Sequence, residues 1–179
     1  MTILHIDSSI LGEHSVTRQL TGAIRARMAA DGQPVVYRDL VADPIPAFVP
    51  GNDAGIIDEF LAADTVIIGA PMYNFSLSSQ LKNWIDHICV AGKTFRYTES
   101  GPEGLAGGKR VIIALSRGGV YSGESPAAPL EHLETYLTGV FGFLGVTPEF
   151  VIAEGVAMGD EAGAAAVSGA QEEIAAMAA

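Results

Sequence analysis

Residues 8–17 (SSILGEHSVT) bring together small hydroxyl side chains at the start of an expected helix. The first N–H groups of a helix have no partner within it and carry a partial positive charge, so they suit a phosphate. Ser9, Ser15 and Thr17 could add hydroxyl donors, although Ser15 could equally be an ordinary helix cap. The segment contains neither GxGxxG nor a Walker lysine, which disfavours a dinucleotide fingerprint and an NTPase loop.

A second segment, Pro71-Met72-Tyr73-Asn74-Phe75, puts large apolar and aromatic side chains where an expected strand turns into a helix. Small and polar residues are usual at such a turn. Tyr and Phe could stack on an aromatic ring, and the amide of Asn74 could both donate to and accept from a heterocycle edge. The same residues could form a hydrophobic plug or an oligomer contact, so both interpretations stay open at this point.

The third segment is Ser116-Arg117-Gly118-Gly119. Paired glycines let a planar ligand approach the backbone closely, and their N–H groups could meet ring carbonyls. A plain turn is the simpler interpretation of two glycines alone. Taken together, the three segments offer phosphate donors, flat walls and edge donors, which fits a mononucleotide with a planar head group.

The elements that must position these segments alternate along the chain. Residues 92–108 are rich in glycine and predict a long loop or flap, and Asp31-Gly32 is expected to end the first helix. Alternation predicts an α/β domain over residues 1–179, flavodoxin-like, with a five-stranded parallel sheet in the order 2-1-3-4-5 and helices on both faces. Ligands in such folds bind beyond the carboxyl ends of the strands, where the three segments lie. The expected strands are 3–7, 35–39, 65–70, 110–115 and 147–153, and the expected helices are 15–28, 54–63, 77–90, 129–144 and a last one from residue 160.

Composition excludes several classes of protein. The hydrophobic fraction of 49% supports a folded core, and a net charge of −11 argues against nucleic acid as a partner. One cysteine, Cys89, excludes an internal disulfide, and His87 and His132 lack metal-like partners, so we expect no metal. No apolar run reaches the length of a membrane span and no secretory signal is evident, which indicates a cytoplasmic protein with no membrane partner.

At this point the chain resembles a known family. Pro71 to Phe75, followed by Gln80-Leu81-Lys82-Asn83 and Asp86, is similar to the FMN-dependent NADH:quinone oxidoreductase and azoreductase family. Its nearest branch is the bacterial azoreductases, formerly called acyl carrier protein phosphodiesterases. Further matching pieces follow in the expected order over nearly the whole chain: SSIL at 8–11, RDL at 38–40, TFRYTE at 94–99, GPEGL at 101–105, SRGG at 116–119 and AEG at 153–155.

The resemblance implies a site for FMN and an interface. FMN phosphate would be held by Ser9 and by the turn Ser15, Val16 and Thr17. The isoalloxazine would lie against Pro71, Met72, Tyr73, Asn74 and Phe75, and its other edge would meet Ser116, Arg117, Gly118 and Gly119. Family members are homodimers with the site at the interface, so Phe95, Tyr97 and Phe143 would line the substrate pocket, partly from the partner subunit.

The activity implied is a ping-pong transfer of two electrons from NADH or NADPH through FMN to quinones or azo dyes. The cofactor does the redox chemistry, so no catalytic side chain is expected beyond Asn74 as a candidate for tuning the flavin. A non-enzymatic FMN electron carrier or flavin sensor is the alternative. A serine hydrolase using Ser9 is disfavoured, because no GxSxG elbow and no evident His–Asp pair occur.

Two features depart from the family pattern. The segment 43–55 is shorter than in many relatives, where it helps to shape the pocket rim, so the departure bears on substrate range. Val16 occupies a position that is commonly polar, which would leave backbone donation to a phosphate but remove a side-chain contact.

Overall fold

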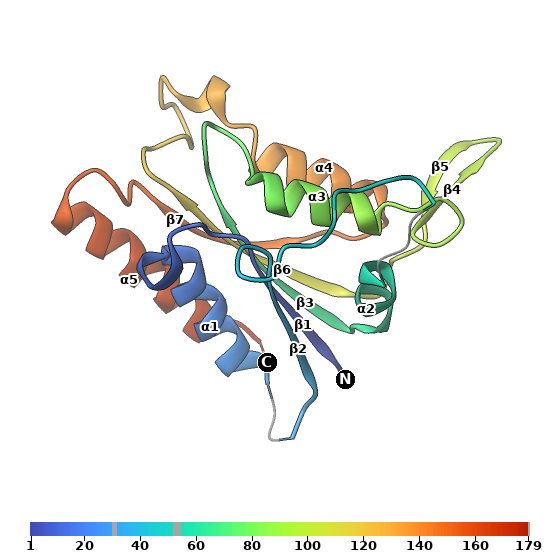
Figure 1. Cartoon of the computed structure of the whole chain (residues 1–179). Helices are drawn as coiled ribbons and strands as arrows, with labels where there is room; N and C mark the ends of the chain where they lie inside the picture. Colours follow the sequence, from blue (N-terminus) through green and yellow to red (C-terminus); the bar gives the residue numbers. More distant parts are fainter. Residues whose placement is uncertain (30–31, 52–54, 179) are drawn as a thin grey trace.

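The computed structural model describes residues 1–29, 32–51 and 55–178. A five-stranded parallel sheet has the order β2-β1-β3-β6-β7 (Figure 1). Its strands are β1 (Ile3–Asp7), β2 (Val35–Asp39), β3 (Thr65–Pro71), β6 (Arg110–Arg117) and β7 (Glu149–Glu154). The predicted flavodoxin-like fold with a five-stranded parallel sheet is confirmed. The predicted numbering 2-1-3-4-5 differs, because two short strands precede the fourth and fifth strands of this sheet.

Helices cover both faces of the sheet. Figure 1 shows α1 (Val16–Met28) and α5 (Asp160–Ala176) on one face, and α2 (Ile56–Ala62), α3 (Ser79–Ile88) and α4 (Glu134–Phe143) on the other. Successive side chains of a strand point to opposite faces, so each strand feeds two cores. In β3, Val66 and Ile68 pack with the α2, α3 and α4 side, whereas Ile67 packs with Leu20 and Ile24 of α1.

The expected flap at 92–108 is not wholly irregular, and this prediction is corrected. It contains an antiparallel hairpin of β4 (Phe95–Thr98) and β5 (Gly101–Gly104). Glycine and proline obscured the strand pattern. The hairpin packs backbone to backbone on the chain after α4: a Cβ at Gly104 would lie 2.1 Å from the Gly145 nitrogen, and the Ala106 N–H donates to the Leu144 carbonyl at 3.0 Å.

Other boundaries shift in ways that matter for the site. β6 runs on to Arg117, so Ser116 and Arg117 belong to a strand and the loop begins at Gly118. The helix expected over 129–144 is a short 3-10 turn, η2 (Ala128–Leu130), followed by α4, whose first N–H groups donate to the Glu131 carboxylate. Another 3-10 turn, η1 (Gly12–His14), precedes α1. The predicted helix end at Asp31 and start at Ala54 lie outside the described residues.

Candidate functional site

The turn after β3 is a strained two-residue hairpin. The Tyr73 N–H donates to the Ser76 carbonyl at 2.8 Å and the Ser76 N–H donates to the Tyr73 carbonyl at 3.1 Å. Between them, Asn74 and Phe75 adopt φ angles of 47° and 73°. Asn tolerates this left-handed region, but for Phe it costs about 1–2 kcal/mol. Such strain persists only where the surroundings impose it, and it concentrates at functional sites.

Contacts from a distant loop hold Phe75 in this conformation. The His132 N–H donates to the Phe75 carbonyl at 3.1 Å. The Phe75 ring meets the Tyr121 ring edge-on, with centroids 6.2 Å apart, and 41% of the residue remains exposed. The turn therefore presents an aromatic ring at the carboxyl end of the sheet instead of burying it in the core.

An open cleft of about 560 Å³ lies beside this turn. Met72 lines this cleft. Its N–H donates to the Ser116 carbonyl at 2.8 Å, which fixes the turn to β6. On the far side, Ser78 caps α3 by accepting the Leu81 N–H at 3.2 Å. The cleft is large enough for a planar ring with a few polar partners. Its lining residues are Ile10, Met72, Tyr73, Asn74, Leu77, Ser78, Ser79 and Gln80.

Tyr73 ties this turn to the first predicted segment. Its hydroxyl lies 3.2 Å from the Ser9 Oγ and accepts the Ile10 N–H at 3.2 Å. The Ser9 Oγ in turn accepts the Leu11 N–H at 3.2 Å. The tertiary structure thus brings together two segments that are more than sixty residues apart in the sequence.

The start of α1 is built around Ser15. Its Oγ accepts the Arg18 N–H at 3.2 Å, so the capping role is observed, and it lies 3.1 Å from the Thr17 Oγ1. Both side chains are buried, and Thr17 faces inward, where a Cβ on Gly69 would lie 3.4 Å from its Oγ1. A phosphate here would therefore depend chiefly on the N–H groups of Val16 and Thr17, which have no acceptor within the helix.

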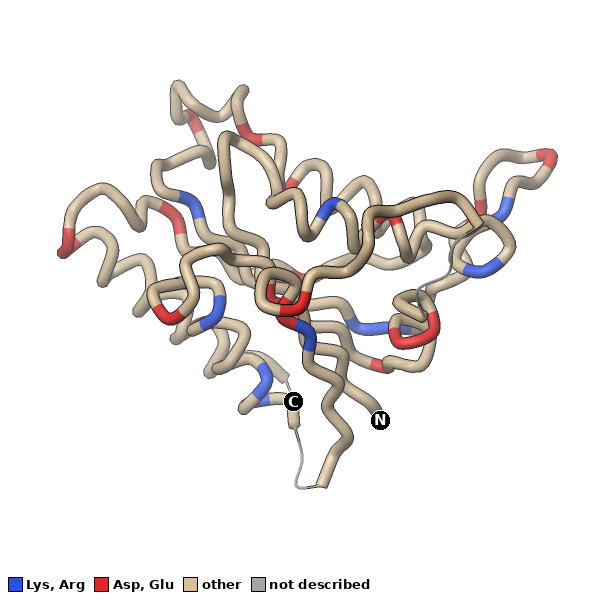
Figure 2. The backbone as a smooth tube through the Cα atoms, viewed as in Figure 1, with Lys and Arg blue, Asp and Glu red and all other residues tan. Residues whose placement is uncertain are grey.

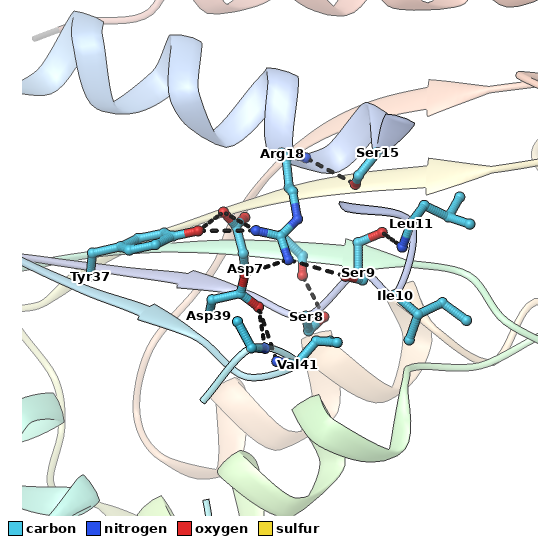
Figure 3. Close-up of polar contacts among 12 residues, drawn as sticks. Asp7, Ser8, Ser9, Ile10, Leu11, Ser15, Arg18, Tyr37, Asp39 and Val41 are labelled. Carbon is cyan, nitrogen blue, oxygen red and sulfur yellow. Dashed lines mark hydrogen bonds and ion pairs between the residues drawn. The ribbon is translucent and has the colours of Figure 1, made fainter. Parts of the chain in front are cut away.

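Behind this loop lies a charged network that the sequence did not reveal (Figure 3). Asp7 and Asp39 end β1 and β2, and both approach the guanidinium of Arg18. The Tyr37 hydroxyl donates to the Asp7 Oδ2 at 3.0 Å, and burial together with that carboxylate raises the pKa of Tyr37 to about 12. The only signal in the sequence was an aspartate at the carboxyl end of two neighbouring strands.

Asp7 stays ionised despite its burial. Burial raises the pKa of its carboxyl, but the His5 ring 3.5 Å away and hydrogen bonds from Thr21 and Tyr37 hold that pKa below its ordinary value. Space beside it is tight, because a Cβ on Gly69 would lie 2.8 Å from the Asp7 Oδ1. A fixed negative charge therefore lies directly behind Ser8 and Ser9.

The third segment has an unexpected arrangement. Arg117 is 1% exposed, and its guanidinium contacts Glu154 at 3.1 Å, Glu131 at 3.5 Å and also Glu134. Glu154 also accepts the Tyr121 N–H at 2.6 Å. The Arg117 side chain thus anchors the loop that follows β6, and a contact from this residue to a ligand would have to come from its backbone.

Gly118 and Gly119 lie against the chain after β7. The Gly155 N–H donates to the Gly119 carbonyl at 3.1 Å, and the Ala157 N–H donates to the Gly118 carbonyl at 3.0 Å. The Tyr121 ring is 3.5 Å from the position that a Cβ on Gly119 would take. Because Tyr121 also touches Phe75, this ring bridges the second and third segments.

The three aromatic residues expected to line the substrate pocket, Phe95, Tyr97 and Phe143, lie away from the cleft. The Phe95 ring centroid is 4.5 Å from that of Phe143 and 5.6 Å from that of Tyr97, and Tyr97 is 75% exposed. Thr94 ties the hairpin to the C-terminal end of α3 by donating to the Ile88 carbonyl at 2.6 Å. The cleft is at the other end of this ten-residue helix, a distance of about 15 Å. One chain does not bring the trio to the cleft.

The described residues provide no evident metal site and no membrane-spanning helix. Figure 2 shows Lys and Arg spread over several elements of the described chain. Among residues 1–29, 32–51 and 55–178, no three His, Cys, Asp or Glu side chains are placed to hold a metal ion. Within those ranges, the helices are also too short or too polar to cross a bilayer.

Comparison with known proteins gives consistent matches. The profile of a family described as having the flavodoxin-like fold matches residues 1–178. The chain is 52% identical, over 198 aligned positions, to an FMN-dependent NADH:quinone oxidoreductase of Sinorhizobium fredii (strain NBRC 101917 / NGR234), covering 98% of this chain and 96% of that protein. It is 51% identical to FMN-dependent NADH:quinone oxidoreductase 2 of Bradyrhizobium diazoefficiens, covering 95% of each.

Solved structures agree with these relatives. The crystal structure of azoreductase AzrA has a TM-score of 0.87 and 31% identity, covering 98% of this chain and 97% of that one. The alignment to the Sinorhizobium protein is longer than the 179 residues of this chain, so that relative contains stretches absent here. The shortened segment at 43–55 stays a prediction, and residues 52–54 within it lie outside the described ranges.

Proposed function

The chain belongs to the family with the flavodoxin-like fold whose profile covers residues 1–178, and on that premise we propose that it is an FMN-dependent oxidoreductase. It passes two electrons from NADH to quinones or azo compounds, the activities named for its relatives and structural neighbours. The observation that carries the proposal is the strained turn after β3, whose residues Tyr73 and Asn74 line an open cleft while the adjacent Phe75 ring stays partly exposed.

The residues around the cleft fit FMN in size and chemistry. The N–H groups of Val16 and Thr17, with the Ser9 hydroxyl, would hold the phosphate at the start of α1. The Tyr73 hydroxyl bonds to Ser9 in the loop between β1 and α1, so one hydrogen bond links the residues that would contact the phosphate to those that would contact the ring. The flavin ring would lie against the last residue of β3 and the turn that follows it: Pro71, Met72, Tyr73, Asn74 and Phe75.

The opposite edge of the ring would meet Ser116, Arg117, Gly118 and Gly119. When bound, FMN supplies the ring that takes up and releases the electron pair. The protein supplies donors: the Asn74 amide and the N–H groups of Gly118 and Gly119 would stabilise negative charge at the ring edge. Arg117 contributes by backbone only, because its side chain is committed to three glutamates.

We further propose a homodimer that works in the cytoplasm, with the site completed at the interface. The support is geometric: Phe95, Tyr97 and Phe143 form an aromatic cluster about one α3 length from the cleft of their own chain, and within it Phe95 is buried and only Tyr97 is largely exposed. A second copy could bring its cluster over that cleft. Tyr97, three-quarters exposed, is the member best placed to reach another subunit.

The test is the visible spectrum of the purified protein before and after anaerobic NADH. We expect a yellow protein that NADH bleaches and a quinone restores, with parallel double-reciprocal lines when both substrates are varied. A protein that stays colourless and cannot be reconstituted with FMN would end the proposal. Bleaching by NADH alone also separates an enzyme from a passive electron carrier or sensor, which would need a separate reductase.

A further inference from the structure

Arg18, in the first turn of α1, connects three parts of the molecule (Figure 3). Its Nη2 donates to the Ser9 carbonyl at 3.2 Å and lies 2.7 Å from the Asp39 Oδ2. Its Nη1 donates to the Tyr37 hydroxyl at 3.1 Å and lies 3.7 Å from the Asp7 Oδ2. Both terminal nitrogens are therefore engaged within the protein.

The same residue holds the loop from its other side. The backbone N–H of Arg18 donates to the Ser15 Oγ at 3.2 Å, while its guanidinium grips the Ser9 carbonyl. Ser9 and Ser15 are the two ends of the loop between β1 and α1. Arg18 thus contacts both Ser9 and Ser15, through its side chain at Ser9 and through its backbone at Ser15.

The charges behind the loop make this role necessary. Asp7 and Asp39 place two carboxylates behind a segment that is expected to receive a phosphate, which carries between one and two negative charges near pH 7. Arg18 lies between them and is 19% exposed, so its charge is screened little by water. Without it, two carboxylates would face the phosphate with no cation between them.

We propose that Arg18 is a positioning residue for the FMN phosphate, its side chain acting through the Ser9 carbonyl and by screening Asp7 and Asp39. This inference rests on the proposed function. It concerns the phosphate, because Arg18 does not line the cleft that would take the ring; that lining comes from the loop after β3, the first turn of α3 and Ile10.

The experiment compares FMN with riboflavin, which has the same ring and no phosphate. Apoprotein is titrated with each flavin, and quenching of flavin fluorescence gives the Kd. For Arg18→Gln we expect the Kd of FMN to rise about ten- to a hundredfold, the worth of one or two charge-assisted hydrogen bonds, and that of riboflavin to stay within about twofold. The ³¹P shift of bound FMN should move as well.

The matched control is Arg38→Gln. Arg38 makes the same kind of partly buried ion pair, with Glu59, and is 22% exposed, but it contacts no part of the loop. Its removal changes the net charge equally and should leave both affinities unchanged. Arg18→Lys keeps the positive charge but loses the two terminal nitrogens of the guanidinium, so it should retain part of the FMN affinity. It also provides a second variant if Arg18→Gln does not fold.

Two results would overturn the inference. One is an equal loss of affinity for FMN and riboflavin, which would indicate general destabilisation; the other is an unchanged FMN affinity in Arg18→Gln. Failure of the proposed function is separate and is visible in the wild-type protein, which would then bind no FMN or hold FMN that NADH does not reduce. Wild-type protein that binds no FMN would remove both proposals.

Discussion

The hydroxyl of Tyr73 lies 3.2 Å from the Oγ of Ser9, and this contact joins the loop after β3 to the loop after β1. The same hydroxyl accepts the Ile10 N–H, so one phenol oxygen bonds both the side chain and the backbone of the opposite loop. In a parallel sheet these loops share one edge, but only a specific bond fixes their spacing.

Tyr73→Phe should therefore weaken FMN binding more than it weakens the fold. It removes two hydrogen bonds at a partly exposed position, so we expect a loss of about 1 kcal/mol in the free energy of unfolding. The Kd for FMN should rise about tenfold, because the two loops lose their fixed distance. Urea unfolding and fluorescence titration measure the two effects.

Tyr136→Phe is the matched control, since Tyr136 packs on the core from α4. It should leave the FMN affinity unchanged. An unaltered affinity in Tyr73→Phe as well would show that the bond between the loops has no part in binding.

Phe75→Gly should leave stability almost unchanged while it lowers activity. Glycine adopts a φ of 73° without strain, and the relief of about 1–2 kcal/mol offsets the lost ring contacts. A typical Phe truncation in a core costs several times more. Loss of the ring should reduce the rate of quinone reduction at least about tenfold, measured by stopped-flow reoxidation of the reduced protein.

Asn74→Gly tests whether relief of backbone strain in the turn is enough to lower the rate of quinone reduction, because it relaxes residue 74 and keeps the Phe75 ring. We expect smaller losses, confined to the contribution of the Asn74 amide. A full rate in Phe75→Gly would rule out the Phe75 ring as a functional part of the wall of the flavin site.

Tyr97→Ala should impair turnover without changing the stability of the subunit. The residue is 75% exposed, and surface substitutions usually change stability by less than about 0.5 kcal/mol. If its ring completes the pocket of another copy, the KM for quinone should rise while the affinity for FMN stays the same. Steady-state kinetics and fluorescence titration give the two values.

Mixing subunits distinguishes a pocket shared between copies from one within a chain. The Tyr97→Ala subunit keeps the Phe75 ring, and the Phe75→Gly subunit keeps the Tyr97 ring. A heterodimer of the two would therefore contain one site with both rings and one site with neither. Random pairing should restore about a quarter of the wild-type sites. If mixing restores no activity, Tyr97 and Phe75 of the same chain contribute to the same site.

Cys89 should be unreactive at neutral pH. Burial raises the pKa of its thiol to about 11, with a smaller contribution from Asp86, so almost none of it is thiolate at pH 8. Reaction with a disulfide reagent should be much slower than that of free cysteine, whose pKa is near 8.5. Rapid labelling in native conditions would contradict this burial.

The same shift predicts a pH dependence of stability with a definite sign. The thiol loses its proton more readily in the unfolded chain, so its contribution is fully present below about pH 9 and is lost as the pH rises toward 11. Cys89→Ala should flatten this part of the curve of unfolding free energy against pH. Tyr37, whose pKa is also raised, remains in both proteins and is cancelled by the comparison.

Local pattern was enough to predict much of this molecule. Hydrophobic periodicity located β1, β3 and α1 almost to the residue, because strands and helices bury side chains at fixed spacings along the chain. The rule that parallel strands end at one edge then placed the three segments near one another. Ser9, Tyr73 and Asn74 could be selected for this reason, and the structure brings Ser9 and Tyr73 into contact.

Tertiary structure decided the rest. The ion cluster of Arg117 joins residues 14, 17 and 37 positions away, the Arg18 network joins the ends of two strands, and a loop more than forty residues beyond Phe75 holds its strained φ. The β4–β5 hairpin depends on glycine fitting against Gly145. Such features come from contacts between distant parts of the chain, and sequence periodicity records only which face of an element is buried. The sequence by itself therefore determined the fold and the edge where a ligand would bind, and only the folded chain determined which charges are already paired there.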